Sequence, residues 1–172
     1  MGLRRIHTDK EPALHKVCKT VTSFDWRLRK LLDDMRDTLI DSNGVGLAAP
    51  QVGILKRVVL VDTGEEILEL VNPELVETRG EQEGVEGCLS VPGVYAEVRR
   101  PSKIKVEYYD ENLEKVVEVF DRFACRMVQH ELSHLEGNLF VDNVSPIRRK
   151  MILRKLQAIS KGTVQTRYKS KR

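Results

Sequence analysis

The sequence has no uninterrupted apolar stretch that approaches the length needed to cross a bilayer. Its first ten residues are polar and include three basic side chains, and they lack the apolar segment of a secretory signal. Only three cysteines are present, at irregular spacing, which argues against a disulfide framework. We therefore expect a cytoplasmic protein with no membrane partner, in which a cysteine is free to act as a ligand or in catalysis.

The chain does have the composition of a globular protein, with 172 residues of which 41% are hydrophobic and 32% charged. This length suffices for one domain with a proper core but not for two. The net charge of +3 is unevenly spread, because ten basic and no acidic residues lie from Ser145 onward. We predict one domain over residues 1–162 and a basic, flexible tail over residues 163–172. Such a basic end either binds phosphate backbones or forms a solvated helix face with a loose tail.

The first predicted helix runs from Asp25 to Ser42, with Ser23 or Asp25 as its cap and Asn43-Gly44 at its end. Its apolar stripe consists of Phe24, Leu28, Leu31, Leu32, Met35 and Leu39. The small residues of the following run, 44–53, predict no regular element there.

The middle of the chain is rich in β-branched and aromatic residues, which favour strands. The predicted strands are Arg57–Asp62, Ile67–Asn72, Lys103–Tyr109 and Lys115–Phe120. A hairpin turn is predicted at Asp110-Glu111-Asn112, and another turn at Val91-Pro92-Gly93. Because no helices separate these strands, we predict an antiparallel or mixed sheet rather than a doubly wound one.

Two further helices are predicted in the last third of the chain. One spans Arg122–Glu136 between a capping Asp121 and a terminating Gly137, and the other runs from Ser145-Pro146 to about Ser160. The apolar stripe of the last helix is Ile147, Met151, Ile152, Leu156 and Ile159. The predicted fold class is α+β, with antiparallel or mixed β-sheets packed around a central helix and with an N-terminal helix and a basic C-terminal helix.

The predicted central helix carries the sequence His130-Glu131-Leu132-Ser133-His134. Residues four apart lie on the same face of a helix, so both imidazoles can reach one metal ion. Glu131 can then reach a water molecule on that ion. Only four histidines exist and two of them fall in this pattern, so we favour a metal-dependent hydrolase over a helix with two structural histidines.

The third ligand of such a site is missing downstream. Phe140 stands where one metalloprotease pattern, HExxHxxGxxH, has its last histidine, and no carboxylate follows Asp142. Upstream, His7 and His15 have no motif around them. The ligand is therefore expected among the upstream cysteines.

Cys88 is the better of two candidate cysteines for the third ligand. Cys125 lies five residues before His130, which places it far round the helix. Cys88 follows a glycine that allows its side chain to point at the helix, and a thiolate suits Zn²⁺ or Fe²⁺. We predict Cys88, His130 and His134 as metal ligands and Glu131 as the residue that transfers protons in a catalytic metallohydrolase domain.

Three motifs resemble those of the peptide deformylase family. They are GVGLAAPQVG at residues 44–53, EGCLS at residues 86–90 and QHELSHLEG at residues 129–137. The resemblance covers essentially the whole chain, and three motifs in order are far more specific than HExxH alone.

The resemblance implies a hydrolase that removes the N-formyl group from the N-terminal formylmethionine of newly synthesised polypeptides and releases formate. It implies one divalent metal ion, usually Fe²⁺ in this family, although two imidazoles and a thiolate also suit Zn²⁺, Ni²⁺ and Co²⁺. The expected partners are N-formylmethionyl nascent peptides. The basic C-terminal helix and tail would also suit ribosomal RNA.

The resemblance further implies roles for individual residues. Glu131 takes a proton from the attacking water and passes it to the departing amine, while the Gln51 side-chain amide and the Leu89 backbone N–H stabilise the oxyanion. The main chain of Gly46 binds the peptide as an added strand. The predicted methionine pocket consists of Val45, Phe123 and Met127, with Glu86 at its edge.

Two residues depart from the family pattern. Ser133 stands where the family usually has an Asp, which is expected to pair with an arginine near Arg100. Ser133 can supply no charge to that arginine. Arg126 stands where many members have an apolar residue that lines the substrate pocket.

Two alternative functions remain open from the sequence. An HExxH endopeptidase would cleave internal peptide bonds and would not need Cys88. A catalytically silent deformylase-like protein would bind ribosomes through its basic end, and Ser133 supports this alternative. The intact set of Gln51, Cys88, His130, Glu131 and His134 argues against it.

Overall fold

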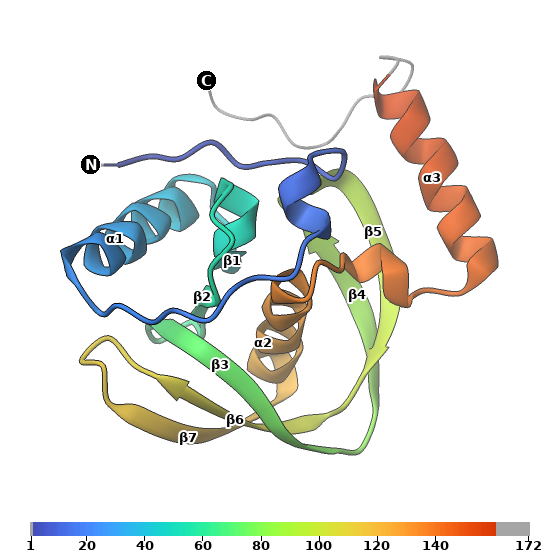
Figure 1. Ribbon diagram of the computed structural model, residues 1–172. Coiled ribbons are helices and arrows are strands. Elements are labelled where there is room, and N and C mark those ends of the chain that lie inside the picture. The colour runs from blue at the N-terminus through green and yellow to red at the C-terminus, as the bar shows by residue number, and fades with distance from the viewer. Residues whose placement is uncertain (1, 161–172) are drawn as a thin grey trace.

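The computed structural model describes residues 2–160, and this part of the chain contains three α-helices and seven strands (Figure 1). The helices are α1 (Trp26–Asp41), α2 (Arg122–Leu135) and α3 (Pro146–Ser160). The strands are β1 (Gly46–Ala48), β2 (Val58–Asp62), β3 (Ile67–Arg79), β4 (Gln82–Cys88), β5 (Val91–Arg100), β6 (Lys103–Tyr109) and β7 (Lys115–Asp121). Single turns of 3-10 helix occur at Pro12–His15, Ala49–Val52 and Phe140–Asn143.

The strands form two antiparallel sheets. One has the order β1-β2-β3-β6-β7, and the other is the β4–β5 hairpin. The predicted α+β class with antiparallel sheets is therefore confirmed, and so is the turn at Asp110-Glu111-Asn112, which joins β6 to β7.

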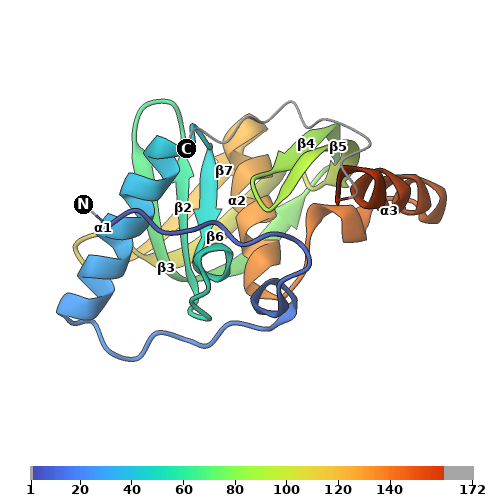
Figure 2. The same cartoon turned by 90° about the horizontal axis from the view of Figure 1, so that it is seen from above.

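Helices α1 and α2 lie on opposite sides of the larger sheet near β2 (Figure 2). Successive side chains of a strand point to opposite faces. Val59 and Val61 of β2 accordingly pack with the core beneath α2, whereas Val58 and Leu60 pack with the core beneath α1. The continuous apolar sequence of β2 is explained by this burial on both faces.

Helix α1 confirms the prediction within one residue at each end. The Asp25 side chain accepts hydrogen bonds from the backbone N–H groups of Arg27 and Leu28, and Asn43 adopts a left-handed φ of 53° just after the helix. The predicted stripe is buried except at Phe24, which is exposed.

The β4–β5 hairpin is absent from the prediction, and the expected turn at residues 91–93 was wrong. The chain turns at Leu89-Ser90 instead, and residues 91–93 belong to β5. Pro92 and Gly93 favour turns in most contexts, so the sequence predicted a turn where the structure has the start of β5. The first strand of this hairpin, β4, ends at Cys88, one of the predicted ligands.

A second correction concerns residues 44–53, which were expected to be irregular. Gly46–Ala48 pairs with β2 as the edge strand β1, and the 3-10 turn Ala49–Val52 follows it. Small side chains weaken the strand signal, but tertiary contacts with β2 and α2 decide the structure here.

Helix α2 begins directly after β7 and ends one residue earlier than predicted. Asp121 stands at the N-cap position, but its side chain makes no capping hydrogen bond, contrary to the prediction. Gly137 follows the helix with a φ of 77°, and a Cβ there would lie 2.9 Å from the carbonyl carbon of His15. Only glycine fits this close approach, so the end of α2 is fixed.

Helix α3 begins at Pro146 as predicted, but its predicted apolar stripe was wrong in part. Ile152 is buried and Leu156 is partly buried against the β4–β5 hairpin, whereas Ile147 and Met151 are 76% and 64% exposed. The predicted tail at residues 163–172 lies outside the described residues. Within residues 2–160, no helix combines the length and the apolarity that a membrane span requires.

Candidate active site and metal centre

His130 and His134 project from the same face of α2, as their spacing predicts. Both side chains are buried, and their ring centroids lie 5.2 Å apart in an edge-to-face arrangement. His130 is also stacked on Phe140 at a centroid distance of 5.8 Å. Phe140, which replaces the third histidine of one metalloprotease pattern, therefore packs against the site rather than serving as a ligand.

Cys88 reaches the two histidines from the end of β4. A register shift between Gly87 and Cys88 marks the point where β4 leaves the regular ladder, and Cys88 Sγ lies 3.4 Å from Nε2 of His134. One ligand atom from each of Cys88, His130 and His134 lies within 4.8 Å of the other two. The structure thus brings the three predicted ligands together.

The donor set fits a divalent transition metal. Nδ1 of His130 is hydrogen-bonded to a carboxylate, which leaves Nε2 as the atom that can bind a metal. Burial lowers the pKa of His134 well below its ordinary value, so this ring is neutral, the form that ligates metals. One thiolate and two imidazoles, with a cavity beside them, match a three-ligand site that leaves a position open.

The other two cysteines take no part in this group. Cys125 is buried near the start of α2, where its sulfur lies 3.5 Å from the carbonyl oxygen of Pro101. Cys18 is buried in the core beneath the sheet, and burial raises the pKa of its thiol to about 11.

Glu131 lies beside the metal-ligating group and is buried. Its Oε1 and Cδ atoms would lie 2.5 and 2.9 Å from a Cβ placed on Gly46, so the carboxylate rests directly on the backbone of β1. Within the part of the chain that the structure describes, its Oε2 has no hydrogen-bond partner. Burial raises the pKa of Glu131 to about 7, which suits a group that accepts and returns a proton near neutral pH.

Gln51 is buried in the 3-10 turn after β1, and its amide is held in one orientation. Its Oε1 accepts a hydrogen bond from the Ala48 backbone N–H at 2.9 Å. Its Nε2 donates to Ser90 Oγ at 3.1 Å and lies 3.5 Å from Cys88 Sγ. The amide donor therefore points at the same corner of the site as the thiol, next to Leu89.

A cavity of about 460 Å³ opens beside these groups, between β1, the β4–β5 hairpin and the start of α2. All the predicted site residues line it except His134, which lies deeper. Val45 and Phe123 are exposed at the cavity, while Met127 is buried. The cavity is also lined by residues that were not predicted for the site: Asn43, Gly44, Val85, Gly87, Val91, Pro92, Gly93, Val94 and Tyr95. The valines and the tyrosine of this segment were the available signal for a strand beside the site.

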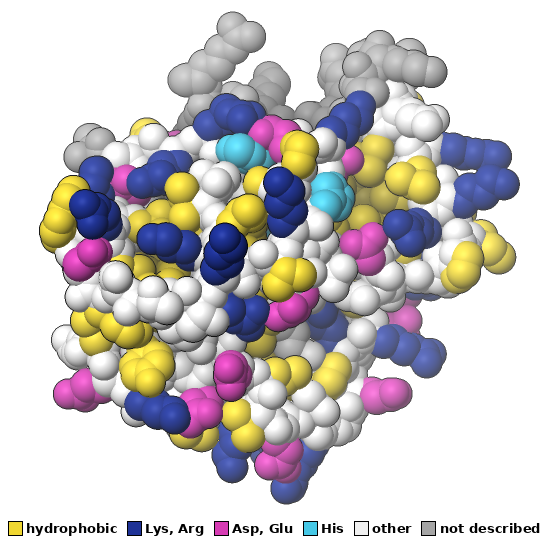
Figure 3. Space-filling model, in the orientation of Figure 1, with side chains coloured by type: hydrophobic (Ala, Val, Ile, Leu, Met, Phe, Trp, Pro, Cys, Tyr) yellow, Lys and Arg dark blue, Asp and Glu magenta, His cyan; other side chains and the backbone are white. Residues whose placement is uncertain are grey.

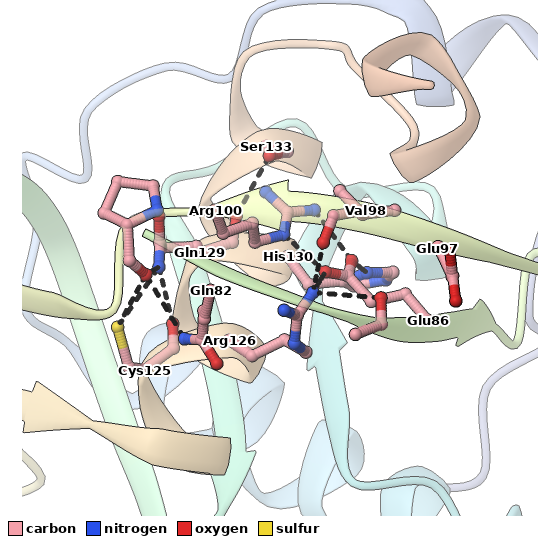
Figure 4. Close-up of polar contacts among 12 residues, drawn as sticks. Gln82, Glu86, Glu97, Val98, Arg100, Cys125, Arg126, Gln129, His130 and Ser133 are labelled. Carbon is pink, nitrogen blue, oxygen red and sulfur yellow. Dashed lines mark hydrogen bonds and ion pairs between the residues drawn. The ribbon is translucent and has the colours of Figure 1, made fainter. Parts of the chain in front are cut away.

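Glu86 is buried, and both of its carboxylate oxygens are engaged (Figure 4). Oε1 lies 2.9 Å from Nδ1 of His130, and Arg100 donates to both oxygens, at 2.6 and 2.8 Å. Burial favours the neutral acid, but the hydrogen bonds from Arg100 and His130 lower the pKa of Glu86 to about 2. Glu86 is thus an ionised carboxylate that also lines the cavity.

The two departures from the family pattern, Ser133 and Arg126, both lie on α2 but contact different groups. Ser133 donates its hydroxyl to the Gln129 carbonyl oxygen at 3.0 Å, and Arg100 pairs with Glu86. Arg126 does not line the main cavity; it is buried and also pairs with Glu86, at 2.6 Å.

The sequence matches a known protein family over most of its length. Residues 3–150 match the model of a family described as polypeptide deformylase. The peptide deformylase of Acetivibrio thermocellus is 49% identical over 144 residues, which cover 84% of this chain and 85% of that protein. Peptide deformylase 1 of Bacillus subtilis is 45% identical over 147 residues, which cover 84% of this chain and 92% of that protein.

Solved structures agree with the sequence matches. The crystal structure of a peptide deformylase from Legionella pneumophila has a TM-score of 0.89 and 39% identity, and the match covers 94% of this chain and 98% of that one. The peptide deformylase from Synechococcus elongatus, solved in complex with actinonin, has a TM-score of 0.84 and 38% identity, with coverage of 88% and 85%.

Proposed function

The chain belongs to the polypeptide deformylase family, and from this premise we propose how its own residues carry out the removal of the formyl group from nascent polypeptides. The observation that carries the proposal is the convergence of three ligand atoms, from Cys88, His130 and His134, beside the buried carboxylate of Glu131, whose Oε2 has no hydrogen-bond partner among the described residues.

The proposed metal ligands are Cys88 Sγ and one ring nitrogen each from His130 and His134. A thiolate and two neutral imidazoles leave one positive charge on a divalent ion and suit Fe²⁺, Zn²⁺, Ni²⁺ and Co²⁺. We propose Fe²⁺ as the ion used in the cell. When bound, the ion supplies a water molecule whose pKa is lowered to near neutrality.

Glu131 is proposed to accept the proton of the attacking water and to return it to the departing amine. Burial raises the pKa of Glu131 to about 7, which suits a carboxylate that accepts and then returns a proton near neutral pH. This role is supported by the contact of Oε1 with β1, the strand along which we expect the peptide to bind, and by Oε2, which no described residue engages. Attack at the formyl carbon then yields formate and a free N-terminus.

The negative charge that develops on the formyl oxygen needs hydrogen-bond donors. We propose the Gln51 amide and the Leu89 backbone N–H for this role, because both lie beside Cys88 at the wall of the cavity. The two hydrogen bonds of Gln51 to Ala48 and Ser90 hold its amide ready before the substrate arrives. Such preorganisation is worth on the order of 100-fold in rate or more for each donor.

The peptide is proposed to bind along β1. In the described residues, β1 pairs only with β2, so its other edge faces the cavity at Val45 and Gly46. An extended peptide adds to such an edge through main-chain hydrogen bonds around Gly46. The methionine side chain would then enter the apolar part of the cavity, and Val45, Phe123 and Met127 are proposed to hold it, with Glu86 at the edge.

Helix α3 supports a proposal that the enzyme binds ribosomal RNA where nascent chains emerge, which implies a cytoplasmic location. Lys and Arg side chains gather on the part of the molecule occupied by α3 (Figure 3). Arg148 and Arg149 form ion pairs with Glu97 and Asp142, whereas Lys150, Arg154 and Lys155 are exposed and form no ion pair with another residue of the described range 2–160. Binding by such residues should weaken with salt.

The ribosome proposal is tested with two changes to the basic end. Reversal of charge at Lys150, Arg154 and Lys155, or removal of residues 163–172, is expected to weaken sedimentation with ribosomes while activity on short formylated peptides is unchanged. Lys103→Glu, an exposed change on β6, serves as the control. Equal ribosome binding by all variants would contradict the proposal.

The metal and catalytic proposal is tested with Cys88→Ala. We expect this variant to lose bound metal and formate release together, as measured by elemental analysis and by a formate assay on a formylmethionyl peptide. An HExxH endopeptidase that does not need Cys88 would keep both. A catalytically silent relative would bind metal in the wild-type chain and release no formate.

A further inference from the structure

The segment of residues 7–18, which we call the N-terminal strap, lies outside the three motifs but is bonded to the site through its backbone. The His7 N–H donates to the carbonyl oxygen of Gln51 at 2.7 Å, and the Asp9 N–H donates to the carbonyl oxygen of Ser90 at 2.8 Å. The chain before α1 passes β1 and then runs beside α2 and the β4–β5 hairpin (Figure 1, Figure 2). The strap therefore joins the 3-10 turn after β1 to the turn between β4 and β5.

The far end of the strap is anchored to α2 and to the core. The Cys18 N–H donates to the carbonyl oxygen of Leu135 at 2.8 Å, at the end of the helix that carries the histidines. Leu14 is fully buried, in the cluster that also contains residues of β5. The first residues of a domain are usually loose unless contacts of this kind tie them down. The strap is thus a fixed part of the structure around the site.

Side chains hold the near end of the strap on the turn that carries Gln51. Gly53 ends this turn with a φ of 81°, and a Cβ there would lie 2.9 Å from Cε1 and Nε2 of the His7 ring. Nδ1 of the same ring lies 2.7 Å from Oε2 of Glu11, and Arg5 donates to both oxygens of Glu11 at 2.8 Å. Because Gly53 has no side chain, the ring packs directly on the turn. This packing keeps the His7 N–H at the carbonyl oxygen of Gln51.

The two carbonyl oxygens that the strap binds belong to the turns that carry the proposed oxyanion donors. Gln51 supplies its side-chain amide, and Ser90 directly follows Leu89, whose backbone N–H is the second donor. A hydrogen bond from Gln51 Nε2 to Ser90 Oγ, at 3.1 Å, joins the same two turns through side chains. His7 and Asp9 are only two residues apart, so their N–H groups set the spacing of the two turns. Donors act on an oxyanion only at hydrogen-bond distance, so this spacing bears on the rate.

We propose that His7 and Asp9 are positioning residues for the reaction, whose backbone N–H groups hold the Gln51 amide and the Leu89 N–H at the spacing that the oxyanion requires. This inference rests on the proposed roles of Gln51 and Leu89 and adds to them. Its consequence is that the chemical step depends on a segment that does not line the cavity. Misplacing a catalytic group by about 1 Å typically costs on the order of 100-fold in rate.

The test removes each N–H with proline, which has none, and uses alanine at the same position as the matched control. His7→Pro and Asp9→Pro are expected to lower kcat for formate release by about 10- to 100-fold, with KM and Co²⁺ content unchanged. Asp9→Ala retains the N–H and should keep the wild-type kcat. His7→Ala retains the N–H but loses the ring that packs on Gly53, so its kcat should lie between those of His7→Pro and the wild type.

A second measurement asks whether the effect of His7 passes through Gln51. In the Gln51→Ala background, His7→Pro is expected to lower kcat no further, because the donor that His7 positions is already absent. Glu11→Ala keeps every backbone N–H and removes the carboxylate beside the His7 ring. This variant is expected to lower kcat less than His7→Pro does, and also to have no effect in the Gln51→Ala background.

A merely structural role for the strap would lower the unfolding temperature of the proline variants but leave the kcat of the folded variants equal to that of their alanine partners, and that result would overturn the proposal. An equal loss of kcat with and without Gln51→Ala would show that His7 does not act through Gln51, which would also overturn it. If His7→Pro does not fold, Glu11→Ala is judged against the wild type in both backgrounds. Absence of formate release from the wild-type chain would instead contradict the proposed function.

Discussion

Gly46 of β1 and Glu131 of α2 are in direct contact, because a Cβ at Gly46 would lie 2.5 Å from Oε1 of Glu131. The glycine is therefore required by the position of the carboxylate and not by a positive φ. The contact links the proposed peptide-binding edge to the proposed proton carrier, and it yields the first prediction.

Gly46→Ala is expected to displace the Glu131 carboxylate and to lower kcat/KM by about 100-fold, the typical effect of misplacing a catalytic group by about 1 Å. Metal content should not change. Gly64→Ala is the matched control. A Cβ at Gly64 would lie within 4 Å of no described atom, but the residue has a φ of 89°, so the alanine should reduce stability without affecting the rate. Steady-state formate release from both variants checks this, and normal activity of Gly46→Ala would contradict it.

Gln51→Ala is predicted to lower kcat by about 100- to 1000-fold with little effect on KM, since the amide is proposed to act on the charge of the transition state. The control is Gln82→Ala, because the Gln82 amide donates to the carbonyl oxygens of Pro101 and Arg122, away from the candidate site. A Gln51→Ala variant that raised KM alone would show that Gln51 binds the ground state instead.

Glu86→Gln is predicted to weaken metal binding by about 10- to 100-fold, because it removes the charge that orients His130. It also leaves Arg100 and Arg126 without a buried counter-charge, which costs roughly 3–5 kcal/mol of the free energy of unfolding. Glu97→Gln, at an exposed ion pair on β5, should change neither quantity. Chelator competition measures the loss of metal affinity, and denaturant unfolding measures the loss of stability. An unaltered metal affinity would refute the prediction that Glu86 supports metal binding through His130.

The environment of Asp34 predicts how the stability of the protein depends on pH, independently of the active site. Burial raises the pKa of this carboxyl, but hydrogen bonds from Lys30 and Arg4 outweigh burial, so its pKa lies below the ordinary value. A depressed pKa contributes stability that is fully present above the unfolded-state pKa, about 3.9, and is lost as the pH falls below it. The difference in Tm between wild type and Asp34→Asn should therefore be largest near neutral pH.

Thermal unfolding of the wild type and of Asp34→Asn, measured between pH 7 and pH 2, tests this prediction. The Tm values of the two proteins should converge as the pH approaches 2. Asp33→Asn is the matched control, because Asp33 is exposed and pairs with Arg29 one turn along α1. A constant difference across the pH range would exclude the proposed linkage.

The sequence predicted those elements whose apolar residues repeat at one clear period. Helix α1 and strand β6 lie where the pattern placed them, and the three spaced motifs predicted the family that the comparisons confirm. The β4–β5 hairpin escaped because Pro92 and Gly93 interrupt its pattern. In α3 the predicted apolar stripe is wider than the face of the helix that is buried, so Ile147 and Met151 are exposed.

The grouping of Cys88, His130 and His134 was predictable because the two histidines lie one helix turn apart and the cysteine lies in a motif of its own. The contacts of Glu86 could not be predicted from the sequence, because they join residues of β4, β5 and α2 that only the tertiary packing brings together. Arg126 illustrates the limit: its position in the family pattern suggested the substrate pocket, whereas its side chain turns to Glu86 and the carbonyl oxygen of Val98.

The most direct test of the whole account is formate release from a short formylmethionyl peptide by protein purified anaerobically with Fe²⁺, beside an unformylated control peptide. We expect rapid release by the wild-type chain, and loss of that release in Glu131→Ala while the metal content stays the same. No release from wild-type protein that contains its metal, or full activity of Glu131→Ala, would exclude the proposed roles of the metal ligands and Glu131.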